Sequence, residues 1–128
     1  MNLLLDTHTF YWWSFEPTKL SDVARDAIAD PANAVYLSVA SPWEIVIKSE
    51  IGRLQLRQPI DVVVATHVAT SGFRVLPVEL RHVYSLRGLP LHHKDPFDRL
   101  LMAQSIADTL TIVTKDAVFA QYPVTTLW

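Results

Sequence analysis

The sequence contains no cysteine, which excludes disulfide bonds and metal sites built from thiolates. It also lacks any apolar run near the ~20 residues that a membrane span requires. The first apolar run, NLLL (2–5), is broken by Asp6 and is too short for the apolar region of a signal peptide. These absences favour a soluble protein of the reducing cytoplasm that has no membrane partner.

An excess of positive charge is missing as well. Eleven Lys and Arg residues stand against 13 Asp and Glu, for a formal net charge of −2. Proteins that coat nucleic acid usually carry a basic face, so this balance argues against a coat protein but allows an enzyme that contacts a few phosphates. Half of the 128 residues are hydrophobic, and there are no repeats or linkers, which predicts a single domain over residues 1–128.

Apolar β-rich runs alternate with helical patterns along the chain. Strands are expected at residues 2–5, 34–40, 73–78, 110–114 and 122–128, and helices at 19–30, 41–52, 59–72 and 98–109. Alternating strands and helices imply βαβ crossovers, and therefore an α/β fold whose parallel sheet is covered on both faces. In such sheets, ligands bind beyond the carboxyl ends of the strands.

Four acidic residues lie where a strand is expected to end or a helix to begin: Asp6, Glu44, Asp98 and Asp116. Because a parallel sheet gathers these positions at one edge, we expect the four carboxylates to lie close together. Such a cluster is costly unless a cation neutralises it. Ligands that are all oxygen suit Mg²⁺ or Mn²⁺. The four acids are therefore the predicted catalytic and metal-binding residues.

Each acid also has a structural interpretation. SPWE (41–44) has the form of a capping box, in which the serine caps the helix and the glutamate returns a hydrogen bond. DPFD (95–98) follows the same pattern with Asp95 as the cap, and Asp116 suits a turn. Asp6 is harder to explain in this way, because a carboxylate directly after a buried strand needs a partner.

Four stretches together resemble the successive motifs of PIN domains, and in particular the VapC-like toxins of bacterial toxin–antitoxin pairs: LLLDTHTFYWW, SPWEIVIKSEIGRL, HHKDPFDRLLMAQ and TIVTKDAVFAQYPV. The resemblance implies a three-layer α/β/α fold with a mainly parallel sheet. It also implies a Mg²⁺- or Mn²⁺-dependent endoribonuclease that acts on RNA and is neutralised by an antitoxin protein. By motif, Asp6, Glu44 and Asp98 match the core acids, and Asp116 matches the more variable fourth. His8 stands where many relatives carry a small polar residue.

Other polar side chains near the acids are candidates for supporting the site or contacting RNA: Thr114, Asp95, His93, Arg99 and Lys48. Each has an ordinary alternative as a surface or helix residue. Lys48, for example, lies four residues after Glu44, where a helix favours an ion pair. A loop histidine such as His93 is commonly solvated.

The stretch FYWW (10–13) places four large rings in a row, more than one helix face can bury. Part of this ring area is therefore expected at an interface, either in a homodimer or with an antitoxin. The candidate interface residues are Tyr11, Trp12 and Trp13. Trp43, at the start of a helix, is expected in the core.

Three other functions compete with the ribonuclease. A phosphatase of the haloacid-dehalogenase type also uses an aspartate after its first strand, but it needs a second acid two residues later, where this chain has His8. A DNA-cleaving nuclease on the same fold has the same acids. A catalytically idle binding domain would keep the fold and a groove for a partner.

Overall fold

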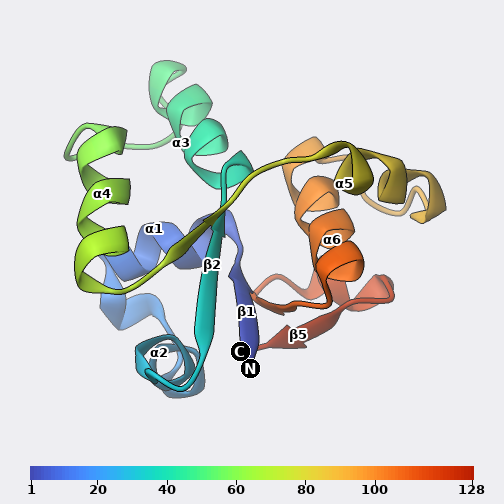
Figure 1. Ribbon diagram of the computed structural model, residues 1–128. Coiled ribbons are helices and arrows are strands. Elements are labelled where there is room, and N and C mark those ends of the chain that lie inside the picture. Colours follow the sequence, from blue (N-terminus) through green and yellow to red (C-terminus); the bar gives the residue numbers. More distant parts are fainter.

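A computed structural model describes residues 1–128, and its centre is a five-stranded parallel sheet (Figure 1). The strands are β1 (Asn2–Leu5), β2 (Ala34–Ser38), β3 (Arg74–Leu76), β4 (Thr111–Val113) and β5 (Thr125–Leu127). Their order across the sheet is β3-β2-β1-β4-β5, and every neighbouring pair is parallel. The predicted α/β fold with a parallel sheet is confirmed.

Helices cover both faces of this sheet and form the outer layers of an α/β/α sandwich. They are α1 (Thr7–Phe15), α2 (Asp22–Ala29), α3 (Ala40–Glu50), α4 (Ile60–Thr70), α5 (Leu80–Ser85) and α6 (Pro96–Asp108), with short 3₁₀ turns η1 (Pro17–Lys19), η2 (Leu86–Gly88) and η3 (Ala117–Gln121). Figure 1 shows α1 to α4 on one side and α5 and α6 on the other. None of these helices combines the length and apolar character required to span a bilayer.

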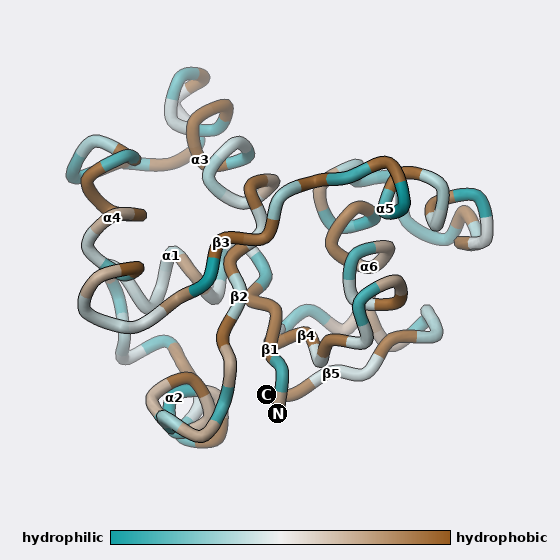
Figure 2. Tube along the Cα trace, in the orientation of Figure 1, coloured by the Kyte–Doolittle hydropathy of each residue, from teal (hydrophilic) through white to brown (hydrophobic).

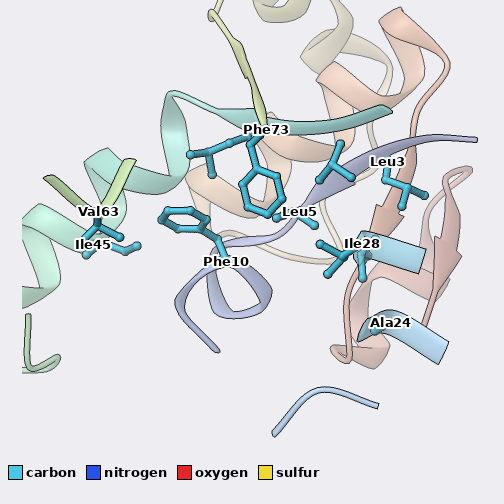
Figure 3. Close-up of a cluster of buried hydrophobic side chains, with 11 residues drawn as sticks. Leu3, Leu5, Phe10, Ala24, Ile28, Ile45, Val63 and Phe73 are labelled. Carbon is cyan, nitrogen blue, oxygen red and sulfur yellow. The ribbon is translucent and has the colours of Figure 1, made fainter. Parts of the chain in front are cut away.

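Two separate cores lie on the two faces of the sheet, because successive strand residues point to opposite sides. Leu3 and Leu5 of β1 belong to one core, and Leu4 between them belongs to the other. In the first core the rings of Phe10 and Phe73 meet with their centroids 6.4 Å apart (Figure 3). Figure 2 shows the central strands in brown, as expected for strands that are buried on both faces.

The start of α3 differs from the prediction. The helix begins at Ala40, and Ser41 is a buried residue inside it instead of its cap. Ser38, the last residue of β2, takes part of the capping role, because its Oγ accepts a hydrogen bond from the backbone N–H of Ala40 at 3.1 Å. The chain therefore turns from strand to helix two residues earlier than the capping-box pattern indicates.

The C-terminal half departs from the predictions in three other places. The expected strand at 73–78 ends at Leu76, directly before Pro77, which has no N–H to donate to a strand ladder. Only the last part of 122–128 forms a strand. The helix α5 and the turn η2 were not predicted.

Candidate active site

Asp6 is fixed at the carboxyl end of β1. It is the N-cap of α1, where its Oδ1 accepts a hydrogen bond from the backbone N–H of Thr9 at 2.8 Å. Its Oδ2 accepts a hydrogen bond from Oγ1 of Thr114 at 2.5 Å, and Thr114 follows the neighbouring strand β4. Only 5% of Asp6 is exposed. The ends of two adjacent strands therefore hold this carboxylate from two directions.

Glu44 lies in the first turns of α3 and is also buried. Its Oε1 accepts a hydrogen bond from Oγ1 of Thr7 at 2.6 Å, and Thr7 follows Asp6 directly in the chain. Its Oε2 lies 2.5 Å from Nζ of Lys48, as expected of an ion pair one helical turn apart. Thr7 thus links the second acid to the backbone that carries the first.

Asp98 lies in the first turn of α6. Its backbone N–H donates to Oδ1 of Asp95 at 2.9 Å, so the predicted cap is present. Its Oδ2 lies 2.8 Å from Nε2 of His93, which comes from the loop before the helix. Burial raises the pKa of Asp98 to about 6, and the charges of Asp95 and Glu44 add to this while His93 opposes it. The first turns of α3 and α6 lie close together, because Trp43 of α3 packs against Phe97 of α6 with ring centroids 4.9 Å apart.

Asp116 is exposed and caps η3, because its Oδ1 accepts a hydrogen bond from the backbone N–H of Val118 at 3.0 Å. Its own N–H donates to Oγ1 of Thr114, the threonine that also holds Asp6, at 3.0 Å. A cavity of about 160 Å³ lies between the two acids. Its lining consists of Asp6, His8, Trp12, Lys115 and Asp116.

No three of the predicted acids have ligand atoms that all lie within 4.8 Å of one another. The one group of three acidic or imidazole side chains whose ligand atoms all lie within 4.8 Å of one another is His93, Asp95 and Asp98. Asp95 already accepts a hydrogen bond as the cap of α6. Asp98 is thus the one predicted metal ligand in this group, and Asp6, Glu44 and Asp116 lie outside it.

The donor set nevertheless fits a hard divalent cation. Burial raises the pKa of Asp6, against the lowering effect of hydrogen bonds from Thr114 and Thr9. The carboxylates of Asp6 and Asp98 are thus both held where burial makes their negative charge unfavourable. A cation nearby would offset this cost. Mg²⁺ keeps several of its waters and uses only one or two carboxylates, so it tolerates acids that are spaced apart. Asp6, Glu44 and Asp98, with Asp116, are the residues that could hold it.

Arg99 and His93, two of the other polar candidates, hold the loop before α6 in place beside Asp98. Arg99 donates from Nη1 to the backbone carbonyl of Pro90 at 2.7 Å and, more weakly, to that of His93 at 3.3 Å. It therefore anchors the loop that carries His93. The backbone N–H of His93 in turn donates to the hydroxyl of Tyr122 at 2.8 Å. The loop histidine is thus held against Asp98 and is not freely solvated.

The aromatic predictions need two corrections. Tyr11 is only 7% exposed, and its hydroxyl donates to the backbone carbonyl of Gln55, so it belongs to the core and not to an interface. Trp43 is 58% exposed and packs edge-on against Phe97, because the residue before a buried Glu44 faces outward on α3. Trp12 and Trp13 are partly exposed.

The sequence-based prediction missed Thr7, which follows Asp6 directly in the chain and donates its hydroxyl to Glu44. The signal in the sequence was the stretch DTHT (6–9), which places two threonines in the first turn of a helix directly after an acid. Thr7 donates to Glu44, and Thr9 donates from Oγ1 to the carbonyl of Val113 at 2.9 Å. A strand-end acid followed by alternating threonines therefore indicates a polar network at this edge of the sheet.

Comparisons with known proteins agree with this architecture. The PIN domain model matches residues 3–124. Ribonuclease VapC22 of Mycobacterium tuberculosis is 35% identical over 119 residues, which cover 89% of this chain and 86% of that protein.

Solved structures share the fold at low sequence identity. VapBC2 from Rickettsia felis, solved with a DNA fragment from its promoter, matches with a TM-score of 0.74 at 12% identity, over 99% of this chain and 98% of that one. VapBC-1 from nontypeable Haemophilus influenzae matches with a TM-score of 0.64 at 15% identity, over 99% and 97% of the two chains. The chain belongs to the PIN-domain family, and a VapC ribonuclease is among its relatives.

Proposed function

We propose that this protein is a Mg²⁺- or Mn²⁺-dependent endoribonuclease and the toxin of a toxin–antitoxin pair. The observation that carries the proposal is the set of acids at the carboxyl edge of the sheet, of which Asp6 and Glu44 are buried and Asp98 is partly buried. Asp6, Glu44 and Asp98 are the proposed core metal ligands, and Asp116 is the fourth acid. The relationship to a ribonuclease supports RNA as the substrate.

A divalent cation bound by these acids would supply Lewis-acid activation of water and would neutralise charge on the phosphate oxygens. The chain itself provides the positions. Thr114 fixes the orientation of Asp6, and Thr7 and Lys48 together fix that of Glu44. Asp116 is exposed and has one side-chain oxygen engaged as a cap, so it is suited to orient a water toward the phosphate.

The direct test is cleavage of RNA by the purified chain with Mg²⁺ or Mn²⁺, and with EDTA. We expect cleavage that EDTA abolishes and that Asp6→Asn and Asp98→Asn reduce at least about 100-fold, as for removal of a group that holds the reacting centre. Asp26→Asn is the matched control, because Asp26 is an exposed acid on α2, outside the site. Full activity of Asp6→Asn, or cleavage that persists in EDTA, would contradict the proposal.

The same assay separates the competing functions. A DNA-cleaving nuclease would degrade single- or double-stranded DNA with the same dependence on metal and on Asp6. An idle binding domain would leave both nucleic acids intact in every condition. RNA cleavage without DNA cleavage is the expected result.

We also propose an antitoxin protein and a second copy of this chain as partners in the cytoplasm. The structural relatives include VapBC-5 from Mycobacterium tuberculosis, which is described as a member of a family of toxin–antitoxin systems. Several large apolar side chains are exposed on β3, on α5 and on the segment between them: Val75, Val78, Leu80, Val83 and Tyr84. Co-expression with the product of an adjacent small gene, followed by measurement of the mass of the complex, tests both partners. A monomer that forms no complex would contradict them.

A further inference from the structure

The cavity beside Asp6 has a composition that metal binding alone does not explain. Two of its five lining residues are acids of the site, and the other three are an exposed histidine, a tryptophan and an exposed lysine: His8, Trp12 and Lys115. A metal site needs oxygen ligands and gains nothing from an indole ring or an ammonium group. These three side chains therefore call for a different ligand.

An aromatic wall forms one side of this cavity. His8 and Trp12 lie four residues apart on α1, so they share a face of the helix, and their ring centroids are 5.6 Å apart. Trp12 also packs against Trp128, at a centroid distance of 5.9 Å. The indole is thus held in place while part of it stays accessible, which is the arrangement that a stacking platform requires.

Lys115 supplies a positive charge beside this wall. It lies between Thr114, which holds Asp6, and Asp116, at the exit of β4. No salt bridge in the structure involves Lys115, whereas Lys48 and Lys19 are each paired with a glutamate. Its ammonium group is therefore available to an anion that enters the cavity.

We propose that this cavity receives one unpaired nucleotide of the RNA substrate, with its base against Trp12 and His8 and its phosphate toward Lys115. The inference rests on the proposed function and names the nucleotide subsite next to its acids. A volume of about 160 Å³ suits one base and not a protein helix, since a helix with its side chains is about 10 Å across. Single-stranded RNA exposes base faces that stack on aromatic side chains, whereas paired bases are hidden in the duplex.

The subsite also predicts how the enzyme selects its cleavage position. Because Asp6 and Asp116 line the same cavity, the bound nucleotide lies directly beside the phosphate that is cleaved. Cleavage is therefore confined to unpaired RNA, and the base preference that the cavity imposes applies to a single position next to the cut.

The test measures RNA binding separately from cleavage. A labelled single-stranded RNA is titrated with Asp98→Asn protein in Mg²⁺, and fluorescence anisotropy gives the Kd. In that background, His8→Ala and Trp12→Leu are expected to raise the Kd about fivefold or more, in line with the loss of base stacking. Lys115→Ala is expected to flatten the dependence of log Kd on log salt by about 0.7, as for one lost phosphate contact on a single strand.

Matched controls come from the same residue types outside the cavity. His92→Ala and Lys19→Ala remove an exposed histidine and an exposed lysine and should leave the Kd and its salt dependence unchanged. Circular dichroism checks that Trp12→Leu is folded, and the exposed His8 gives a variant that does not disturb the core. A duplex RNA of the same sequence should bind more weakly than the single strand and should not respond to Trp12→Leu.

The outcomes separate the two proposals. If the unmutated protein cleaves RNA but the cavity variants bind RNA as tightly as their controls, the nucleotide subsite is wrong and the ribonuclease proposal stands. If the cavity variants lose RNA affinity but the unmutated protein cleaves no RNA with either metal, the subsite stands and the enzyme proposal is wrong. Cleavage-site mapping adds a second readout, because Trp12→Leu should relax the base preference at one position only.

Discussion

Replacing Asp98 with asparagine is expected to make the metal-free protein more stable while it abolishes cleavage. The carboxyl has its pKa raised from 3.8 to about 6, chiefly by burial. A folded pKa above the unfolded value means that the ionised group destabilises the fold at neutral pH. The pKa is raised by about two units, each worth about 1.36 kcal/mol, so the ionised carboxyl of Asp98 lowers the free energy of unfolding by at most about 3 kcal/mol. The hydrogen bond that an asparagine oxygen accepts from His93 is weaker than that of the carboxylate, which offsets roughly 1 kcal/mol and leaves a gain of about 1–2 kcal/mol.

Urea unfolding in EDTA measures this gain. With an m-value of about 1–3 kcal/mol/M, the midpoint of Asp98→Asn should lie roughly 1 M above that of the unmutated protein at neutral pH. The difference should shrink as the pH falls from about 6 towards 3.8, because the folded carboxyl then becomes protonated. Asp26→Asn, an exposed control, should show no such change. An Asp98→Asn protein that is less stable than the parent at neutral pH would refute the reasoning.

Three further predictions concern stability. Hydrogen bonds from Arg81, and to a lesser extent from His82, hold the pKa of Asp108 below its usual range. The stability that Asp108 provides is therefore present at neutral pH and is lost as the pH falls through its folded pKa. The urea midpoint of Asp108→Asn should match that of the parent only in acid, and an equal deficit at every pH would contradict this. Asp95→Ala should cost about 1 kcal/mol of unfolding free energy and Asp95→Asn much less, because asparagine retains the cap; equal losses would show that the cap is not the cause. Mg²⁺ or Mn²⁺ at about 100 times its Kd should raise the free energy of unfolding of the parent by about 2.7 kcal/mol, measured by thermal unfolding. Glu44→Gln should lose most of this stabilisation. If the stabilisation by metal is unchanged in Glu44→Gln, the metal binds elsewhere.

The fold could be predicted because its signals are local. The apolar run before Asp6 has the length and composition of a buried parallel strand, and the alternation of strands and helices fixes the parallel sheet. Lys48 and Glu44 could be paired from the sequence alone, since both lie one turn apart in one helix. The capping of α6 by Asp95 could likewise be predicted from the four consecutive residues DPFD (95–98).

Other features depend on contacts between distant segments. The helix α5 has only six residues, and its first turn is held by Nδ1 of His82, which accepts the backbone N–H of Glu79, while Nε2 of the same ring reaches Asp108 on α6. No pattern of neighbouring residues in the sequence predicts such a helix. The hydrogen bond from His93 to Asp98 depends in the same way on the path of a loop.

The capping-box pattern at 41–44 failed for a related reason. A serine can cap a helix only if the chain is still extended at that residue, and here β2 ends at Ser38 and the helix starts at once. The side chain of Glu44 then points to Thr7, which the pattern does not contain. Glu44 therefore accepts its hydrogen bond from Thr7 and does not bond to the cap residue that the pattern predicts.

The nine residues of α1 link the proposed active site to the hydrophobic interior. Asp6 caps this helix and Thr7 in its first turn donates to Glu44, while Phe10 one turn later is completely buried. A substitution on this helix thus risks damaging both properties at once, which narrows the mutational freedom available for evolving new target preferences. The outward-facing His8 and the half-covered Trp12 are the exceptions. Diversification of specificity among related toxins, or in a laboratory selection, should therefore concentrate at these two sites.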